Sequence, residues 1–488
     1  MGLLNRFLCK INGLAKEKAK KQVDIKATAN IMPNFSHYHG ASFTDTRVRS
    51  WYAPQTGPNY EFSEAEQNVL IARSRDLYRN FPLVTAAVNR LVDSAIGTGI
   101  KFQPRLRFED FPEYTTEELV KISRKIKEDF TVWAETCGVD SRFSFWELQR
   151  QILFSLIVGG DCFWNSVFVK DKLRIQIFEP EQVSNPMSEM ETRKMRRGLA
   201  FDDFGENQGF FIQKEHPADG LLENSFDWEF VPRFGKHSDI VRAGHVADLK
   251  RPGQIRGVPL IAPVLITCKE LSDYFASEQT SAKIASFFTV FIKKQTSSGG
   301  FPFQSEVDKA SESLKPYIPS LAPGAIIELL ENEDISVADP KRPSPQFEKY
   351  VSTISIFICA TLGVPYELVV MSFQSSYSAS RASFLAFCST IDFWREILES
   401  KFLWAVLEIW LRDWLYTHNF INDFSSEEAE KWMQGAWIPP ITRSIEPNKD
   451  IEAALQRVEA GFSTTQREAE QLTGEDINDL RSQEAGNA

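Results

Sequence analysis

The N-terminal half of the chain carries apolar residues at helical spacing between clear start and stop signals. Ser63 with Glu66, and Thr115 with Glu118, each match the capping-box pattern that opens a helix. Pro82 interrupts the first pattern, because proline lacks the backbone N–H that a helix interior needs. We therefore predict helices from Ser63 to Pro82, from there to Ile96, from Thr115 to about Cys137 and from Phe145 to Val158.

The spacing then changes to the two-residue period of strands. Residues 162–169 and 173–178 are rich in aromatic and β-branched side chains, and Lys170-Asp171-Lys172 between them is typical of a turn. This pattern predicts a β-hairpin. Polar loops separate three further short strands, which we predict around Phe210–Ile212, Trp228–Val231 and His245–Leu249.

A long helical pattern follows, beginning at Pro259. After Pro263 there is neither Gly nor Pro until Gly299. A heptad seam runs along it, formed by Val264, Cys268, Leu271, Phe275, Glu278, Ala282 and Ala285. An apolar seam on so long a helix needs a neighbouring element to bury it.

The next segment, residues 300–340, is acidic, with eight acids and two bases. We predict one short helix (306–315) and a strand near Ala325–Leu330 within it. Beyond it the pattern predicts a helix over 345–362, a polar loop over 372–381, a very long helix from about Ser380 to Leu415, and a helical acidic tail after Ser444.

Composition is that of a globular protein, but the charge narrows the functional classes. The 488 residues are 43% hydrophobic and 25% charged, with a formal net charge of −11. The chain thus lacks an overall basic character, so any DNA contact is expected to be loose or local. No apolar run reaches the ~18 residues of a membrane-spanning helix. No two of the six cysteines fall within four residues, which indicates a reduced, intracellular setting.

The first 21 residues differ from the rest, because an apolar helical stripe there is combined with lysines. The stripe consists of Leu3, Leu4, Phe7, Leu8, Ile11 and Leu14, and the lysines are Lys10, Lys16, Lys18, Lys20 and Lys21. We favour a mobile arm that docks on its own assembly. A membrane surface, nucleic acid or the groove of a partner remain alternative targets.

Catalytic motifs are missing from the sequence. There is no GxxxxGK[ST] phosphate loop, no HExxH and no GxSxG. Gly97-Thr98-Gly99 follows a helix and is interpreted as its end. His37 and His39 would share one face of a strand, but no third metal ligand lies near them in sequence. Asp202-Asp203 and the Glu331–Asp334 run are interpreted as solvated loops. We predict no catalytic residues, no metal and no cofactor.

Five stretches, in their order and spacing, resemble the lambda-like family of tailed-bacteriophage portal proteins. They are LIARSRDLYRNFPLVTAAVNRLVDSAIGTGI (70–100), RPGQIRGVPLIAPVL (251–265), TLGVPYELV (361–369), SYSASRASF (376–384) and SIEPNKDIEAALQRVEAGFSTTQREAEQLTGED (444–476). The succession of helix, acidic insert, helix, polar loop and long helix is similar to that family as well. The resemblance spans most of the chain, from about residue 40 to about residue 480.

The resemblance implies an α+β portal fold in a ring-forming subunit, with a wing, stem helices, an α/β clip and a helical crown. On this sequence it implies an N-terminal arm (1–62), a wing (63–258), a first stem helix (259–287), a clip (288–344), a second stem helix (345–362), a tunnel loop followed by a long wing helix (363–440), and a C-terminal crown (441–488).

It also implies a function and partners. Twelve subunits would form a ring at one capsid vertex of the virion, assembled in the host bacterial cytoplasm, as a channel for packaging and ejecting double-stranded DNA. Expected partners are other copies of the chain, the large terminase subunit, the major capsid or scaffold protein, head-completion or adaptor proteins, and transient, non-specific DNA. No enzymatic activity and no small-molecule substrate are expected.

Two sets of site residues follow from the resemblance. The tunnel loop Met371–Arg381 would face DNA through Ser372, Gln374, Ser375, Ser376, Tyr377, Ser378 and Arg381, although for Arg381 a surface role at the helix start is favoured. The clip would meet its partners through Glu306, Asp308, Glu312, Glu331, Glu333 and Asp334.

Two other classes stay open at this point. The first is a phage-associated DNA-processing enzyme, which would need a carboxylate cluster for two metal ions. The second is a peripheral membrane protein anchored by its basic N-terminal helix.

Overall fold

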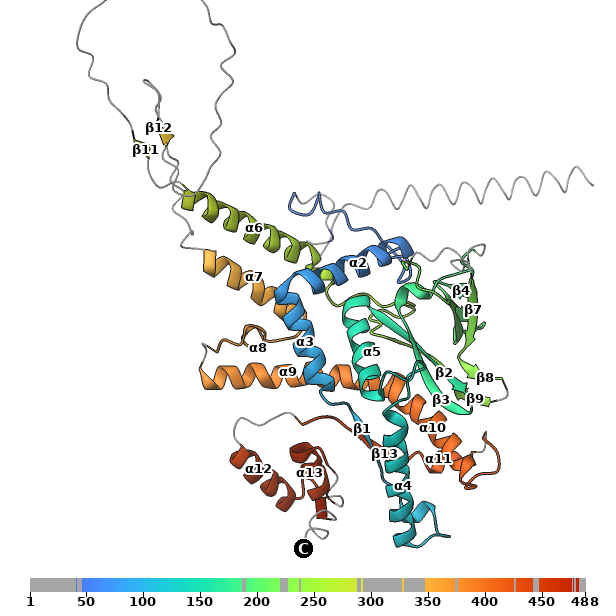
Figure 1. Cartoon of the computed structure of the whole chain (residues 1–488). Coiled ribbons are helices and arrows are strands. Elements are labelled where there is room, and N and C mark those ends of the chain that lie inside the picture. The colour runs from blue at the N-terminus through green and yellow to red at the C-terminus, as the bar shows by residue number, and fades with distance from the viewer. Residues whose placement is uncertain are drawn as a thin grey trace, which may run out of the picture. The chain divides into compact units, whose positions relative to one another are not determined.

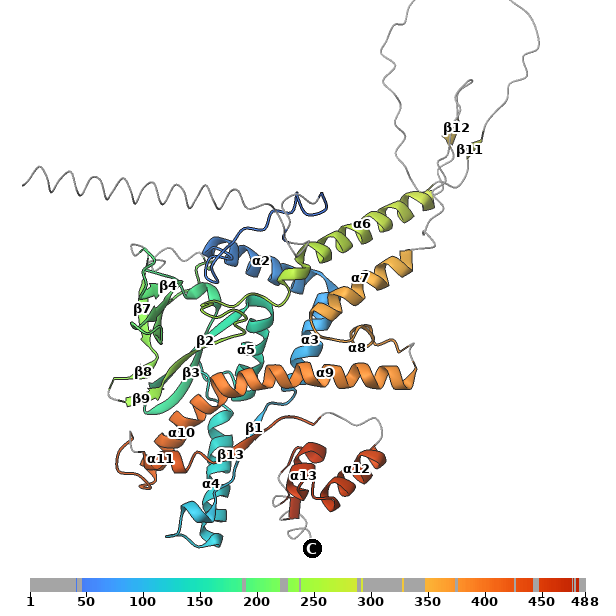
Figure 2. The same cartoon turned by 180° about the vertical axis from the view of Figure 1, so that it is seen from behind.

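The chain divides into two units, Met1–Glu61 and Phe62–Ala488. A computed structural model describes residues 41, 46–186, 190–219, 227–236, 238–287, 291–292, 327–328, 347–373, 376–424, 427–441, 447–475, 477 and 480–481. The basic segment 1–21, His37 and His39 therefore lie outside the described residues. Figure 1 shows the helices and strands of the second unit, and Figure 2 shows them from behind.

The predicted N-terminal helices are present, and their starts follow from the caps. They are α2 (Glu64–Asn80), α3 (Pro82–Ile96), α4 (Thr116–Ala134) and α5 (Phe145–Gly159). At α2 the Glu66 N–H donates to Ser63 Oγ over 3.2 Å, and the Ser63 N–H donates to Glu66 Oε2 over 2.6 Å. The second predicted box opens α4, and Ser144 with Glu147 forms a third at α5. α4 ends at Ala134, slightly before the end predicted at about Cys137.

The predicted hairpin is confirmed. β2 (Asp161–Val169) pairs antiparallel with β3 (Lys172–Phe178) on one side and with β10 (Ala243–Ala247) on the other. The turn consists of Lys170 and Asp171 alone, with φ values of 51° and 60°, the left-handed backbone of a two-residue hairpin turn. Lys172, which the sequence pattern placed in the turn, is the first residue of β3.

Two further sheets follow β2 and β3 in the sequence. The first is four-stranded, in the order β4 (Met195–Arg196), β5 (Leu199–Phe201), β6 (Asn207–Gln213), β7 (Trp228–Pro232), and the second pairs β8 (Phe234–Gly235) with β9 (Ser238–Val241). The three predicted short strands correspond to β6, β7 and β10. Between the two larger sheets lies a small core that includes Phe163, Phe178 and Phe210.

A strand pair between distant parts of the sequence was not predicted. β1 (Lys101–Pro104) pairs antiparallel with β13 (Gly435–Ile438), so that Phe102 lies opposite Trp437. Their rings are 5.3 Å apart between centroids and belong to the main core. The pair therefore joins the N-terminal helices to the C-terminal part of the unit.

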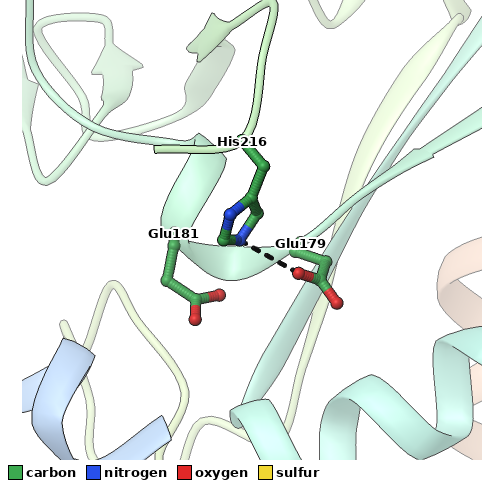
Figure 3. A group of neighbouring side chains, drawn as sticks. All are labelled: Glu179, Glu181 and His216. Atoms are coloured by element: carbon green, nitrogen blue, oxygen red, sulfur yellow. Dashed lines mark ion pairs between the residues drawn. The ribbon is translucent and has the colours of Figure 1, made fainter. Parts of the chain in front are cut away.

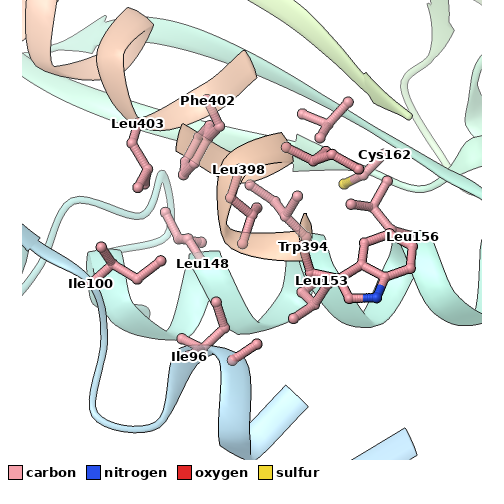
Figure 4. Packing of buried hydrophobic residues seen from close by; sticks show 14 of the residues in the cluster. Ile96, Ile100, Leu148, Leu153, Leu156, Cys162, Trp394, Leu398, Phe402 and Leu403 are labelled. Atoms are coloured by element: carbon pink, nitrogen blue, oxygen red, sulfur yellow. The ribbon is translucent and has the colours of Figure 1, made fainter. Parts of the chain in front are cut away.

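The very long predicted helix forms, but with a different start and an irregular centre. α9 (Tyr377–Leu398) passes through a π-helical segment, Glu399–Leu403, into α10 (Trp404–Thr417). Leu398, Phe402 and Leu403 of this region are fully buried, and Figure 4 shows these side chains meeting those of α5. Phe145 of α5 stacks on Phe402 at 5.4 Å. Trp394, Trp410 and Trp414 of the same region are buried in this core.

The two bracketing helices are α6 (Leu265–Phe287) and α7 (Phe347–Thr361), which lie side by side (Figures 1 and 2). Cys268 of α6 and Cys359 of α7 are both fully buried. The prediction that the first helix begins at Pro259 is wrong. Residues 259–261 are not helical, because the Leu260 N–H donates to the Ile157 carbonyl. A 3₁₀ turn (Ala262–Val264) then precedes α6.

The acidic insert between these helices is described at only two places. β11 (Phe291–Ile292) pairs in parallel with β12 (Ile327–Glu328), which confirms a strand within the predicted 325–330 region. The predicted helix 306–315 lies outside the described residues. Along the seam, Cys268, Leu271 and Glu278 of α6 are buried and Phe275 is half-buried, whereas Ala282 is exposed.

Short helices form the rest of the C-terminal part. They are α8 (Tyr366–Val370), α11 (Glu428–Lys431), α12 (Pro447–Glu459) and α13 (Thr465–Thr473). Helices and mostly antiparallel sheets thus occupy separate parts of the chain, which confirms the α+β class. In the described part of the chain, no helix has the length and apolar character required to cross a bilayer.

Candidate functional site

The predicted tunnel loop lies between α8 and α9 and is shorter than predicted. Ser376 is the N-cap of α9, because its Oγ accepts a hydrogen bond from the Ala379 N–H over 3.4 Å. Tyr377, Ser378 and Arg381, predicted as loop residues, are therefore in the first turns of a helix. Ser376 was not predicted as a cap because it lies in a serine-rich stretch, in which several serines could cap a helix.

The start of this loop is fixed by backbone geometry. Met371 ends α8 in the left-handed conformation, at φ 55° and ψ 33°, and the Ser372 N–H donates to the Glu367 carbonyl over 3.2 Å. Glu367 also accepts a hydrogen bond from the Ser380 hydroxyl over 3.1 Å, which connects α8 to α9. The loop is thus held at both ends by residues of the flanking helices.

The described loop residues face solvent, and they are not all polar. Ser372, Ser376 and Ser378 are exposed, and Gln374 and Ser375 lie outside the described residues. Met371, Phe373 and Tyr377 are 61%, 60% and 50% exposed. The sequence analysis emphasised the hydroxyl and amide groups, but the loop also presents these three large apolar side chains.

Arg381 already has a carboxylate neighbour within its own chain. Its guanidinium lies 3.9 Å from the Asp450 carboxylate of α12, and about half of each side chain is exposed. An exposed pair at that distance contributes little to stability. It nevertheless agrees with the favoured interpretation of Arg381 as a surface residue at the helix start.

A second site, which was not predicted from the sequence, lies where the sheet of β2, β3 and β10 meets the segment before α6. Asp161, the first residue of β2, is fully buried, and its Oδ2 accepts hydrogen bonds from Arg256 Nε at 2.7 Å and from the Gly257 N–H at 3.1 Å. His245 Nε2 of β10 lies 3.2 Å from the same oxygen. We call Asp161, His245 and Arg256 the Asp161–Arg256 cluster.

Arg256 also donates hydrogen bonds to three backbone carbonyls. Its terminal nitrogens donate to the carbonyls of Val183 and Arg197, at 2.9 and 3.0 Å, and to that of Pro180 at 2.7 Å. The guanidinium lies over the ring of Phe163, 5.1 Å from its centroid. One buried side chain thereby connects β2, the segments at 180–183 and at Arg197, and the chain leading into α6.

The charge states of the cluster follow from its surroundings. Burial by itself would raise the pKa of Asp161, but the Arg256 guanidinium and the hydrogen bond from His245 hold this pKa well below its ordinary value. Burial lowers the pKa of His245, and the hydrogen bond to Asp161 only partly opposes that effect. At neutral pH the cluster therefore contains an ionised Asp161, a charged Arg256 and a neutral His245.

Two glycines allow the backbone segments of this cluster to touch. Gly160 has a φ of 93°, and a Cβ at Gly257 would collide with the Gly160 carbonyl oxygen. The pairing of Gly159-Gly160-Asp161 with Arg256-Gly257 thus depends on the absence of side chains. The only signal in the sequence is an acidic residue directly before a strongly apolar strand, which is unusual for a solvated side chain.

Among the described residues, one group has the spacing of metal ligands. It consists of Glu179, Glu181 and His216, shown in Figure 3. Arg75 already pairs with both carboxylates, at 2.6 Å to Glu181 and 3.1 Å to Glu179. His216 Nε2 lies 3.1 Å from Glu179. The arginine neutralises much of the negative charge that a cation would need, so this arrangement is better explained as an ion-pair network.

The six predicted clip residues, Glu306, Asp308, Glu312, Glu331, Glu333 and Asp334, lie outside the described residues. Their role as a partner-binding surface stays a prediction.

Comparisons with known proteins identify the family. A family model described as "Phage portal protein, lambda family" matches residues 44–395. The "Portal protein" of Escherichia phage N15 is 23% identical, covering 92% of this chain and 89% of that protein. "Portal protein B" of Escherichia phage lambda is 22% identical with the same coverage.

Solved structures with a similar trace come from gene transfer agent (GTA) particles. A chain of "Virion of native gene transfer agent (GTA) particle" has a TM-score of 0.42 at 11% identity, covering 84% of this chain and 99% of that one. A chain of "Neck of native GTA particle computed with C12 symmetry" has a TM-score of 0.40 at 10% identity, covering 85% and 94%.

The family match covers well over half of the chain, so this is a phage portal protein, and within that class it belongs to the lambda family. The resemblance drawn from the five sequence stretches is confirmed.

Proposed function

We propose that twelve copies of this chain form a closed ring at one vertex of the phage capsid, and that double-stranded DNA enters and leaves through its channel. The observation that carries the proposal is the family match over residues 44–395, which includes both bracketing helices, α6 and α7. Negative-stain electron microscopy of the purified protein tests it. Rings with a central hole are expected, and a sample containing only monomers would contradict the proposal.

Exposed apolar side chains support assembly with further copies. On α7, Tyr350 and Phe357 are 52% and 63% exposed, and on α9 Leu385 is 59% exposed. Large apolar side chains gathered on neighbouring helices are typical of surfaces that another molecule covers. In a ring, one surface of each subunit meets a different surface of the next, so such contacts repeat until the ring closes.

The domain assignment is part of the same proposal. α6 and α7 are the stem helices, residues 288–344 are the clip, and the segment after α8 is the tunnel loop. The pairing of β11 with β12 supports a clip in which chain segments far apart in sequence lie together. The clip then receives the large terminase subunit during packaging and head-completion or adaptor proteins afterwards, while the wing and crown meet the major capsid or scaffold protein.

Deletion of Gly299–Pro340 is expected to leave a soluble protein but to abolish binding of the large terminase subunit in a pull-down. The reason is that it removes all six predicted clip carboxylates while it leaves α6 and α7 intact. A matched variant with these carboxylates replaced by amides keeps the chain length and tests the contribution of charge. Unchanged binding by the deletion variant would refute the clip assignment.

The charge of the subunit suits a channel through which DNA slides. Each neutralised phosphate adds affinity through counterion release, so a strongly basic channel would retain the DNA. Twelve subunits would carry a formal charge of −132, twelve times −11. Hydroxyl groups of the tunnel loop can form brief hydrogen bonds with passing phosphates, each worth ~1 kcal/mol or less.

Replacement of both Ser372 and Ser378 by Asp is expected to impair DNA packaging, because the new charges repel passing phosphates. Replacement of both by Lys is expected to impair it as well, because the new charges retain the DNA. Both serines are exposed, so ring formation should persist and serves as the control. Ser376 is left unchanged because it caps α9. Full-length genomes packaged at normal yield by both variants would show that the loop does not line the channel.

We infer that the protein is not itself an enzyme, in keeping with a family of structural proteins. A DNA-processing enzyme would reveal itself by metal-dependent cleavage of DNA that is lost on mutation of the chain's own residues. A peripheral membrane protein would reveal itself by flotation with liposomes that depends on residues 1–21. The proposed location is the portal vertex of the virion.

A further inference from the structure

A groove beside α4 differs in charge from the rest of this acidic protein. It has a volume of about 790 Å³ and lies between α4, the segment after β1 and the start of β13. Arg105, Arg107, Arg124 and Lys127 line it, and no Asp or Glu is among its lining residues in the part of the chain that the structure describes. We call it the α4 groove. The chain as a whole has eleven more acids than bases, so four basic side chains around one groove form a local excess of positive charge, which the Glu470 carboxylate only partly offsets.

One cation of the groove already binds a carboxylate. The guanidinium of Arg105 pairs with Glu470, which reaches it from α13. The side chains of Arg107 and Arg124 are exposed, so both guanidinium groups are accessible from solvent. The pair of Arg105 with Glu470 shows that a carboxylate can bind in this groove.

The groove also presents apolar surface. Phe108 and Val120, both lining residues, are 51% and 54% exposed, and Leu106, Trp404 and Met433 line it as well. Exposed apolar side chains next to cations favour a partner that carries both apolar groups and negative charge. Duplex DNA presents mainly phosphate and sugar along its backbone and would leave the apolar surface uncovered. The chain's own N-terminal arm is basic and would be repelled.

We propose that the α4 groove binds an acidic amphipathic segment of a partner protein, a stretch in which carboxylates alternate with large apolar side chains. The carboxylates pair with Arg107, Arg124 and their neighbours, and the apolar side chains cover Phe108 and Val120. No residue of the proposed clip, 288–344, lines the groove in the part of the chain that the structure describes, so the groove is a separate surface. The inference does not depend on ring formation, because every lining residue belongs to one subunit.

The test uses the full-length protein and a fluorescein-labelled synthetic peptide of roughly 15 residues, with Glu and Leu repeating at helical spacing. Fluorescence anisotropy should show saturable binding that weakens as salt is raised, because the charges lie near the surface. The double variant Arg107→Glu/Arg124→Glu should bind about tenfold more weakly or worse, since two attractions become repulsions. A peptide with Ser in place of Leu should also bind more weakly.

Lys121 and Lys125 provide a matched control. They lie exposed on the same helix but do not line the groove, so Lys121→Glu/Lys125→Glu makes the same charge change at nearby positions. This variant should bind the peptide with an affinity close to that of the unaltered protein. Equal loss in both variants would mean that only the overall charge matters, and this result would overturn the proposal.

Two other outcomes would overturn it as well. One is absence of peptide binding by the unaltered protein. The other is binding of a duplex DNA oligonucleotide, but not of the peptide, that requires Arg107 and Arg124. If a peptide with the chain's own residues 474–488 bound more tightly than the Glu/Leu peptide, the occupant would be the tail of a second copy, and a separate partner would be excluded. Electron microscopy of the same samples measures ring formation separately. Failure of the ring proposal can therefore be distinguished from failure of the groove proposal.

Discussion

Replacement of Arg256 by Met is expected to lower the free energy of unfolding by about 3–5 kcal/mol, the range for breaking a buried ion pair from one side. The Asp161 carboxylate, which is fully buried, would keep only His245 and the Gly257 N–H as partners. The carbonyls of Pro180, Val183 and Arg197 would each lose a hydrogen bond from Arg256 as well. Guanidinium unfolding of the full chain, followed by tryptophan fluorescence, measures the change.

The shape of the guanidinium makes a conservative replacement informative. Arg256→Lys keeps the charge but cannot serve the carboxylate and three carbonyls at once, so it should also destabilise, though less than Met. Lys250→Met is the matched control, because Lys250 is 73% exposed and its pair with Asp248 spans 3.7 Å. A surface change of this kind should stay within about 0.5 kcal/mol.

A double-mutant cycle examines whether the pair acts as a unit. If Asp161 and Arg256 stabilise each other, Asp161→Asn combined with Arg256→Met should cost clearly less than the sum of the two single changes. If Arg256→Met alone lowered the free energy of unfolding by less than about 1 kcal/mol, the role given to the cluster would be contradicted. A buried carboxylate without its cationic partner should destabilise the fold by more than that.

Phe357→Asp is expected to convert the ring into monomers. Phe357 is 63% exposed on α7, so in a single subunit the new charge would face solvent and leave the fold unaffected. In a ring of the variant, each subunit interface would lose the apolar Phe357 side chain and gain a negative charge. Loss of one buried Phe weakens a contact by roughly 2 kcal/mol. A closed ring has as many interfaces as subunits, so the effect on assembly multiplies around the ring.

Size-exclusion chromatography with light scattering, together with electron microscopy, measures this change. Phe204→Asp is the matched control, since Phe204 is 98% exposed in the loop between β5 and β6, away from α7 and α9. That variant should still form rings. Rings of normal size and yield from Phe357→Asp would show that this face of α7 lies outside the subunit interface.

Local signals in the sequence determined the helices and the hairpin. The boxes at Ser63 and Thr115 open helices because a side chain three residues from its partner can satisfy the first free N–H groups without help from the rest of the fold. The hairpin register follows from Lys170 and Asp171, which adopt the left-handed backbone between two strands that are adjacent in sequence. The five stretches, in their order and spacing, resemble the portal family, and the family match confirms that resemblance.

Boundaries that depend on distant neighbours were the ones the sequence placed wrongly. Pro259 is a favourable first residue of a helix, but α6 begins later because Leu260 is hydrogen-bonded to Ile157 of α5. Ser376 and Ser380 both resemble helix starts. The structure assigns the cap to Ser376, because Ser380 donates instead to Glu367 of α8.

The sequence by itself determined the order of elements, the α+β class and the portal family, because these rest on spacing and on neighbours along the chain. The tertiary structure decided the pairing of β1 with β13, the α4 groove, and the Asp161–Arg256 cluster, whose two charged residues are 95 positions apart. The physical reason is that an isolated Asp or Arg looks like solvated charge in a sequence. Only folding removes water from both and brings them within 2.7 Å, where each becomes the partner that the other requires.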